Sequence, residues 1–177
     1  MQRFVRLFLA LVFLACCGAA PAAAQAVSLR DELLKDWLAM KQTMHALAER
    51  MPADRYTFKA TPPQRDFGQQ VVHVANANLL NLAFLRGTAK PPTIDRNATS
   101  KDAAIQAMDA SFDYGEALIR EQTDATLMQM VETNRFLGPS SRARVVYFLL
   151  GHAWDIYGQM VVYLRLNGGT PPASERP

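Results

Sequence analysis

The sequence contains little cysteine: of its 177 residues, only Cys16 and Cys17 carry a thiol. Both lie in an N-terminal segment that has the pattern of a removable secretory signal. Without this segment the chain has no disulfide, no thiol nucleophile and no thiolate metal ligand. A secreted protein of this kind must be stabilised by its hydrophobic core. Lipoprotein processing at one of the two cysteines is the alternative, although residues 13–15 fit a lipobox poorly.

The N-terminal segment combines Arg3 and Arg6 with an apolar run over residues 7–15 and small residues that end at Ala24. This order is typical of a signal peptide that is cleaved after Ala24. The apolar run is too short to span a bilayer. We therefore predict a signal peptide over residues 1–24 and an exported protein, periplasmic or extracellular, whose mature domain does not span the membrane.

The mature sequence also has little net charge. The 19 Lys and Arg residues, less Arg3 and Arg6, leave 17 basic side chains against 16 acidic ones, a net charge of +1. The pI near 9.0 of the whole chain therefore does not indicate a nucleic-acid partner. The 153 residues that remain after the 24-residue signal suffice for one domain over residues 25–177 with a sizeable core.

Strand patterns and repeats are lacking in the mature sequence, whereas helical periodicity is strong. Apolar residues at alternating spacings of three and four predict four helices, over residues 28–50, 66–86, 99–122 and 139–169. Each begins near a residue that can cap a helix, namely Ser28, Asp66, Thr99, and Ser140 or Ser141. Proline interrupts the segment before the second helix, Gly87 follows that helix, and residues 123–138 lack a helix-length period. We therefore predict an all-α four-helix bundle in which one long connection crosses over the end.

Several single residues carry further expectations. Gly115 allows a close approach between two helices, and Asn78 must find hydrogen-bond partners because it interrupts an apolar row. We expect Trp37 and Trp154 to be packing residues, and His45 to lie on the surface or rim.

Two other histidines lie inside predicted helices, His73 in the second and His152 in the fourth. The sequence around them resembles the DinB-like (DNA-damage-inducible) superfamily of four-helix bundles over nearly the whole mature chain. The resemblance is carried by MPADRYTFKATPPQRDFGQQVVHVANAN and GHAWDIYGQMVVYLRLNGGTPP. It implies a divalent metal, zinc or nickel, that is held by three histidines. One comes from the second helix and two, at i and i+4, come from the fourth, where they share one face.

The third histidine of this pattern is replaced by Ile156, which cannot bind a metal. Asp155 could substitute because i and i+3 also share a face, and Gln159 is a weaker substitute. We therefore expect a degenerate site of His73, His152 and Asp155 that holds no metal or only a weakly bound zinc or nickel ion. The residues expected to line a pocket beside it are Asn78, Ile156, Tyr157 and Gln159.

Two functions of different classes follow. The first is a non-catalytic binding or scaffold protein for a small molecule, in which Ile156 fills the place of the ion with apolar packing. The alternative, which the resemblance implies, is a metal-dependent thiol transferase or hydrolase that uses His73, His152 and Asp155. Export from the cytosol disfavours a low-molecular-weight thiol as cosubstrate. The resemblance also suggests a homodimer through exposed helix faces.

Overall fold

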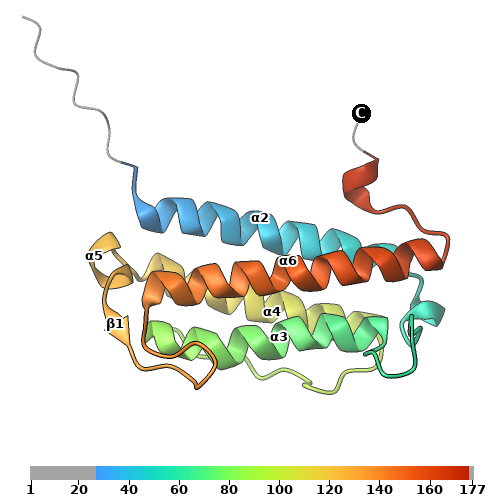
Figure 1. Ribbon diagram of the computed structural model, residues 1–177, viewed down its shortest axis with the longest axis horizontal. Coiled ribbons are helices and arrows are strands. Elements are labelled where there is room, and N and C mark those ends of the chain that lie inside the picture. The colour runs from blue at the N-terminus through green and yellow to red at the C-terminus, as the bar shows by residue number, and fades with distance from the viewer. Residues whose placement is uncertain (1–26, 176–177) are drawn as a thin grey trace, which may run out of the picture.

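The computed structural model describes residues 27–175, so the predicted signal peptide and its cysteines lie outside the described residues. Four long helices form the domain: α2 (Leu29–Arg50), α3 (Phe67–Leu82), α4 (Lys101–Arg120) and α6 (Arg142–Leu166). They lie side by side in one bundle (Figure 1). The predicted all-α four-helix bundle is confirmed. None of the helices within residues 27–175 combines the length and the apolar character that crossing a membrane requires.

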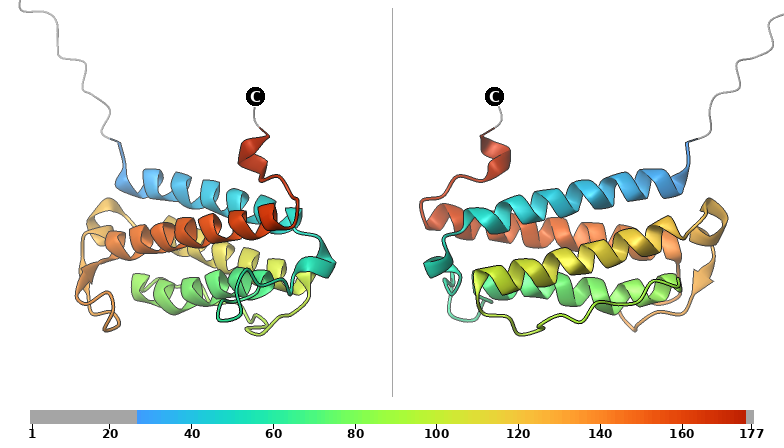
Figure 2. Two further views of the ribbon diagram at one scale, coloured as in Figure 1. Left: turned by 45° about the vertical axis from the view of Figure 1, so that its right-hand side comes forward. Right: turned by 180° about the vertical axis from the view of Figure 1, so that it is seen from behind.

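The helices contact one another in the order α2, α4, α3, α6 and back to α2. The connection after α3 runs back along the bundle before α4 begins, so α3 and α4 are parallel neighbours (Figures 1 and 2). The connection after α4 then crosses one end of the bundle to reach α6. Of the two long connections, the second therefore crosses the end as expected, and the first runs lengthwise. As a result α3 and α6 are antiparallel neighbours, and they carry the two histidines.

Short elements fill the connections. Three 3₁₀ turns, at Ala53–Arg55, Ala83–Leu85 and Pro172–Ser174, follow α2, α3 and α6. The segment without helix-length periodicity holds the single-turn helix α5 (Asp124–Leu127) and strand β1 (Met130–Val131). Strand β1 pairs antiparallel with β2 (Ser140–Ser141), with Met130 opposite Ser141.

The helix boundaries fall within three residues of the predictions except at the end of the second helix, and one predicted cap differs. Ser28, Asp66 and Ser141 each accept a hydrogen bond from a first-turn amide, as the capping rule requires. The cap of α4 is Ser100 rather than Thr99, because the Ser100 side chain reaches the amide of Ala103.

The second difference lies at the end of α3, where Gly87 follows the predicted helix. The α-helix ends at Leu82, and Arg86 takes the left-handed conformation, with a φ of 53°, after a 3₁₀ turn. The chain therefore leaves the helix at Arg86, one residue before the glycine.

The bundle core is built around Trp37 of α2. Its side chain is fully buried, and its Nε1 donates to the carbonyl of Phe112 at 2.8 Å. The ring lies directly on Gly115 of α4, as the expected close approach requires. Trp154, in contrast, is 55% exposed and contacts Tyr157 on the surface of α6. Both tryptophans were expected to be packing residues. Trp37 is one, whereas Trp154 is largely exposed because it lies off the helix face that carries the buried Ala153 and Ile156.

Candidate functional site

Two polar pairs interrupt the apolar contact between α3 and α6. The Nε2 atoms of His73 and His152 are 3.1 Å apart, and their ring centroids are 4.9 Å apart. One turn from His73 on α3, the Nε2 of Gln70 donates at 2.7 Å to the Oε1 of Gln159, which lies two turns after His152 on α6. The antiparallel arrangement of the two helices brings both pairs together. The predicted convergence of His73 and His152 is therefore present in the structure.

Both imidazoles are partly buried, and their surroundings disfavour the protonated form. Burial, with the charge of Arg65 and the neighbouring His152, lowers the pKa of His73 from 6.5 to about 4. Burial also lowers the pKa of His152, although the Asp155 carboxylate opposes this shift and Arg65 adds to it. Both rings are therefore neutral near pH 7, so one Nε2 donates and the other accepts. The neutral ring is also the form that binds a metal.

The separation of the two nitrogens suits a shared metal ion. With metal–nitrogen bonds of about 2.0–2.1 Å, nitrogens that are 3.1 Å apart subtend about 95–102° at the ion. This angle lies between octahedral and tetrahedral values. The Nδ1 of His152, however, is buried without a hydrogen-bond partner. Histidines that bind a metal almost always donate their second ring nitrogen to a carboxylate, carbonyl or water.

The number of ligands does not match a catalytic centre. Ile156, one turn after His152, is only 3% exposed and belongs to the core. Asp155 is exposed, and its carboxylate accepts a hydrogen bond from Gln159 at 3.2 Å. Within residues 27–175, no three His, Cys, Asp or Glu side chains form a group that could hold a metal. A catalytic zinc normally has three protein ligands, so the residues present do not fit such a centre.

The predicted pocket residues have other roles. Asn78 is fully buried and donates to Ser111 of α4 at 3.1 Å, so it joins α3 to α4. This contact meets the expectation of a hydrogen-bond partner for Asn78. Tyr157 and Trp154 meet edge to face with ring centroids 5.4 Å apart, and His45 is exposed, as predicted, beside the carboxylate of Asp109.

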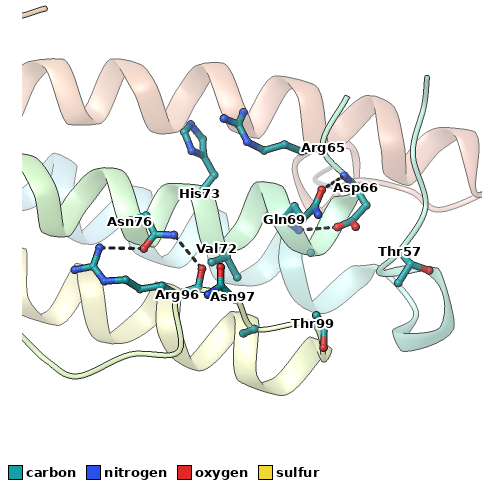
Figure 3. Close-up of a pocket in the computed structure, with 12 residues that line it drawn as sticks. Thr57, Arg65, Asp66, Gln69, Val72, His73, Asn76, Arg96, Asn97 and Thr99 are labelled. Atoms are coloured by element: carbon teal, nitrogen blue, oxygen red, sulfur yellow. Dashed lines mark hydrogen bonds between the residues drawn. The ribbon is translucent and has the colours of Figure 1, made fainter. Parts of the chain in front are cut away.

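A cavity of about 580 Å³ lies beside the histidine pair, along one side of α3 (Figure 3). Its lining includes His73 but not Asn78, Ile156, Tyr157 or Gln159. The cavity therefore lies to one side of the predicted pocket, and His73 is the residue that belongs to both the pair and the cavity.

Sequence reasoning missed the polar side chains of this cavity. Arg65 precedes the cap of α3, Asn76 lies one turn after His73, and Arg96 lies in the connection before α4. Asn76 lies at i+3 from His73 on α3, and this helical spacing is the one signal that could have indicated it. Arg65 precedes the helix and has no such signal. Arg96 reaches the cavity only because its connection runs back along the bundle. Phe148, whose ring centroid is 6.3 Å from that of His152, was also missed.

The fold and the site together define a class: a four-helix bundle with a histidine pair between two antiparallel helices and a cavity beside it. Residues 37–160 match the family profile described as the DinB superfamily. The chain belongs to the DinB superfamily. A comparison with curated proteins finds no match to this chain.

Solved structures share the fold. A DinB-like protein from Bacillus cereus is 20% identical, with a TM-score of 0.66 over 80% of this chain and 95% of that chain. The DinB-like protein YjoA from Bacillus subtilis is 14% identical, with a TM-score of 0.64 over 82% and 99%. YfiT from Bacillus subtilis, described as a probable metal-dependent hydrolase with an unusual four-helix bundle topology, is 11% identical, with a TM-score of 0.65 over 86% and 95%.

Proposed function

We propose that this protein is an exported, non-catalytic binding protein that takes up a small molecule beside its histidine pair. The observation that carries the proposal is the composition of the pair itself. His73 and His152 contact each other directly at 3.1 Å, while Ile156 fills the third position as part of the core. Burial of an isoleucine side chain contributes about 1.5–3 kcal/mol to stability. The site therefore favours a folded, metal-free state in which the Nε2 atoms of the two rings hydrogen-bond to each other.

The cavity beside the pair supports the binding part of the proposal. Its volume of about 580 Å³ falls within the range of small-molecule sites. Its lining combines the apolar Val72 and Ala98 with amide, hydroxyl and guanidinium groups. Such a mixture of apolar surface and a few polar groups is typical of ligand sites.

A metal-dependent thiol transferase or hydrolase is the second candidate. It is favoured by the 3.1 Å separation of the two Nε2 atoms, which suits two ligands of one zinc or nickel ion. It is also favoured by the likeness of the fold to YfiT, a probable metal-dependent hydrolase. In this candidate Asp155 would turn from Gln159 and serve as the third ligand. A bound divalent ion would supply Lewis-acid activation of water or a thiol.

The metal content of untagged protein separates the two candidates. We expect purified wild-type protein to lose zinc and nickel on dialysis, and elemental analysis to find far less than one ion per chain. One zinc or nickel ion per chain that survives dialysis, and that Asp155→Ala removes, would refute the proposal and support the enzyme.

The variant Ile156→His tests the geometry on which both candidates depend. Because residue 156 follows His152 by four residues, the new imidazole completes a three-histidine set. We expect this variant to bind one zinc per chain in calorimetry and to melt at a higher temperature with zinc than without it. The matched control combines Ile156→His with His73→Ala and should lose both effects. Failure of Ile156→His to bind zinc, in protein that is folded by circular dichroism, would contradict the convergence of the two histidines.

A further inference from the structure

The cavity beside α3 carries two cationic side chains that the fold does not neutralise. Arg65 forms no ion pair and its guanidinium makes no hydrogen bond within residues 27–175. Arg96 makes one long hydrogen bond, from Nη1 to the Oδ1 of Asn76 at 3.4 Å. Each guanidinium offers five N–H donors in a planar fork that matches a carboxylate or phosphate. Most of these donors therefore point to no protein acceptor.

The acidic side chain in the cavity lining is already engaged. Asp66 accepts a hydrogen bond from the amide of Gln69 at 2.7 Å, while the Gln69 side chain accepts from the amide of Asp66. This reciprocal cap fixes the carboxylate at the first turn of α3. The cavity lining thus contains two arginines and one carboxylate, and that carboxylate is engaged in capping α3. The net charge of the lining is therefore positive.

The wall that carries Arg96 is held in place from α3. The side-chain amide of Asn76 donates to the Arg96 carbonyl at 3.2 Å and accepts from its guanidinium. Figure 3 shows Arg65 near His73, at the edge of the cavity towards α6, and Arg96 beside Asn76, at the other edge. The two cations therefore stand at opposite edges of one cavity rather than form a single cluster.

The N-termini of two long helices add to this positive field. Asp66 and Gln69 belong to the first turn of α3, and Thr99 lies just before the cap of α4; all three line the cavity. A helix N-terminus carries a partial positive charge that falls off within about one turn. The cavity thus opens at the positive ends of α3 and α4, between two guanidinium groups.

We propose that this cavity selects small polar molecules that carry two acidic groups, carboxylate or phosphate, with one group at Arg65 and the other at Arg96. The proposal names the ligand class of the binding function stated above and therefore rests on it. The amide and hydroxyl groups of Asn97, Thr57 and Thr99 also line the cavity. They suit a ligand whose backbone carries hydroxyl groups, because each can donate or accept a hydrogen bond.

Calorimetric titration of full-length mature protein, stripped of metal and desalted, tests this selection. The two-group probes are malate and 3-phosphoglycerate, the single-group probes are acetate and inorganic phosphate, and glycerol is the neutral probe. We expect at least one two-group probe to saturate the protein and to bind about tenfold tighter than either single-group probe, because it gains a second charge-assisted contact. Tighter binding of malate identifies carboxylate ends, and tighter binding of 3-phosphoglycerate identifies a phosphate end.

Charge-matched variants assign the effect to the cavity. Arg65→Gln and Arg96→Gln should each weaken the two-group probe about tenfold, to the level of a single-group probe. Arg135→Gln is the control, since Arg135 is exposed, lies between β1 and β2, and is not part of the cavity lining. It should leave the affinity unchanged. Because Arg65 and Arg96 are also exposed, all three variants are expected to fold, which thermal melts will check.

Three results would overturn the ligand class. They are no saturation by either two-group probe up to about 10 mM, which means binding weaker than that of a millimolar complex; an equal loss of affinity in Arg135→Gln; or glycerol binding as tightly as malate. The last result would leave the binding function standing while refuting its acidic ligand. Stoichiometric metal in untreated protein would refute the binding function without changing the outcome of these titrations.

Discussion

A single methyl group added at Gly115 should destabilise this protein, although a change from glycine to alanine ordinarily stabilises a helix by about 0.5–1 kcal/mol. A Cβ atom at this position would lie 2.2 Å from Cζ2 and 2.5 Å from Cε2 of Trp37. The indole ring cannot easily move away, because its Nε1 donates to the Phe112 carbonyl and the ring packs on the Phe112 ring at 5.1 Å.

The expected change in the free energy of unfolding combines two destabilising terms and one stabilising term. Overpacking of a core costs about 1–3 kcal/mol, and weakening of the buried hydrogen bond of Trp37 costs about 0.5–1.5 kcal/mol more. The helix propensity of alanine returns about 0.5–1 kcal/mol. We therefore expect Gly115→Ala to lower the free energy of unfolding by about 0.5–4 kcal/mol, measured by urea denaturation followed by circular dichroism.

Two other helical glycines provide matched controls. Gly151 and Gly158 of α6 have no atom within 4 Å of an added Cβ. Gly151→Ala and Gly158→Ala should therefore raise the free energy of unfolding by about 0.5–1 kcal/mol each. If Gly115→Ala stabilises the protein as these controls do, the packing of α4 against Trp37 described here is incorrect.

Further predictions concern the buried polar pair and the pH dependence. Ser111→Ala leaves the buried amide of Asn78 without its acceptor, so the free energy of unfolding should fall by about 1–3 kcal/mol in urea denaturation; an unchanged midpoint would argue against the contact. The amide of Arg30 and other first-turn donors of α2 lower the pKa of the Asp124 carboxyl. Its stabilising effect is therefore present above the ordinary carboxyl pKa and is lost as the pH falls through the lower folded value. Asp124→Asn should flatten the acid limb of melting temperature against pH, and an identical limb would contradict this. For His73, a proton NMR titration of the ring should give a midpoint near 4 rather than 6.5, whereas a midpoint of 6.5 would mean that the ring is hydrated.

The long helices could be predicted because their signals are local. Ser28, Asp66 and Ser141 lie next to apolar runs with a helical period, and each caps a helix in the structure. Thr99 failed as a cap because the neighbouring Ser100 is chemically equivalent, and only the start of the helix decides between them. The exposure of Trp154 was not predicted, because this residue lies at the edge of the apolar stripe of its helix. The sequence there does not say whether a neighbouring helix covers the side chain.

The candidate site was predicted only in part. His73 and His152 were brought together by the resemblance to a known family, and the structure gives the 3.1 Å contact between their rings. Arg96 could not be found in this way, because it lies 23 residues after His73 in a connection without a motif. Its place beside α3 depends on how that connection runs along the bundle (Figure 2).

The sequence by itself determined the number of long helices, the caps of three of them, the close approach at Gly115, and the hydrocarbon side chain at Ile156 where a third ligand would stand. These features depend on residue type and on a repeat of 3.6 residues, both of which are local properties of the chain. Tertiary structure alone decided that α3 and α4 run parallel, that Trp154 faces outwards, and that two arginines flank one cavity. These features depend on which helix faces meet, and that choice is made by packing between segments that are far apart in the sequence.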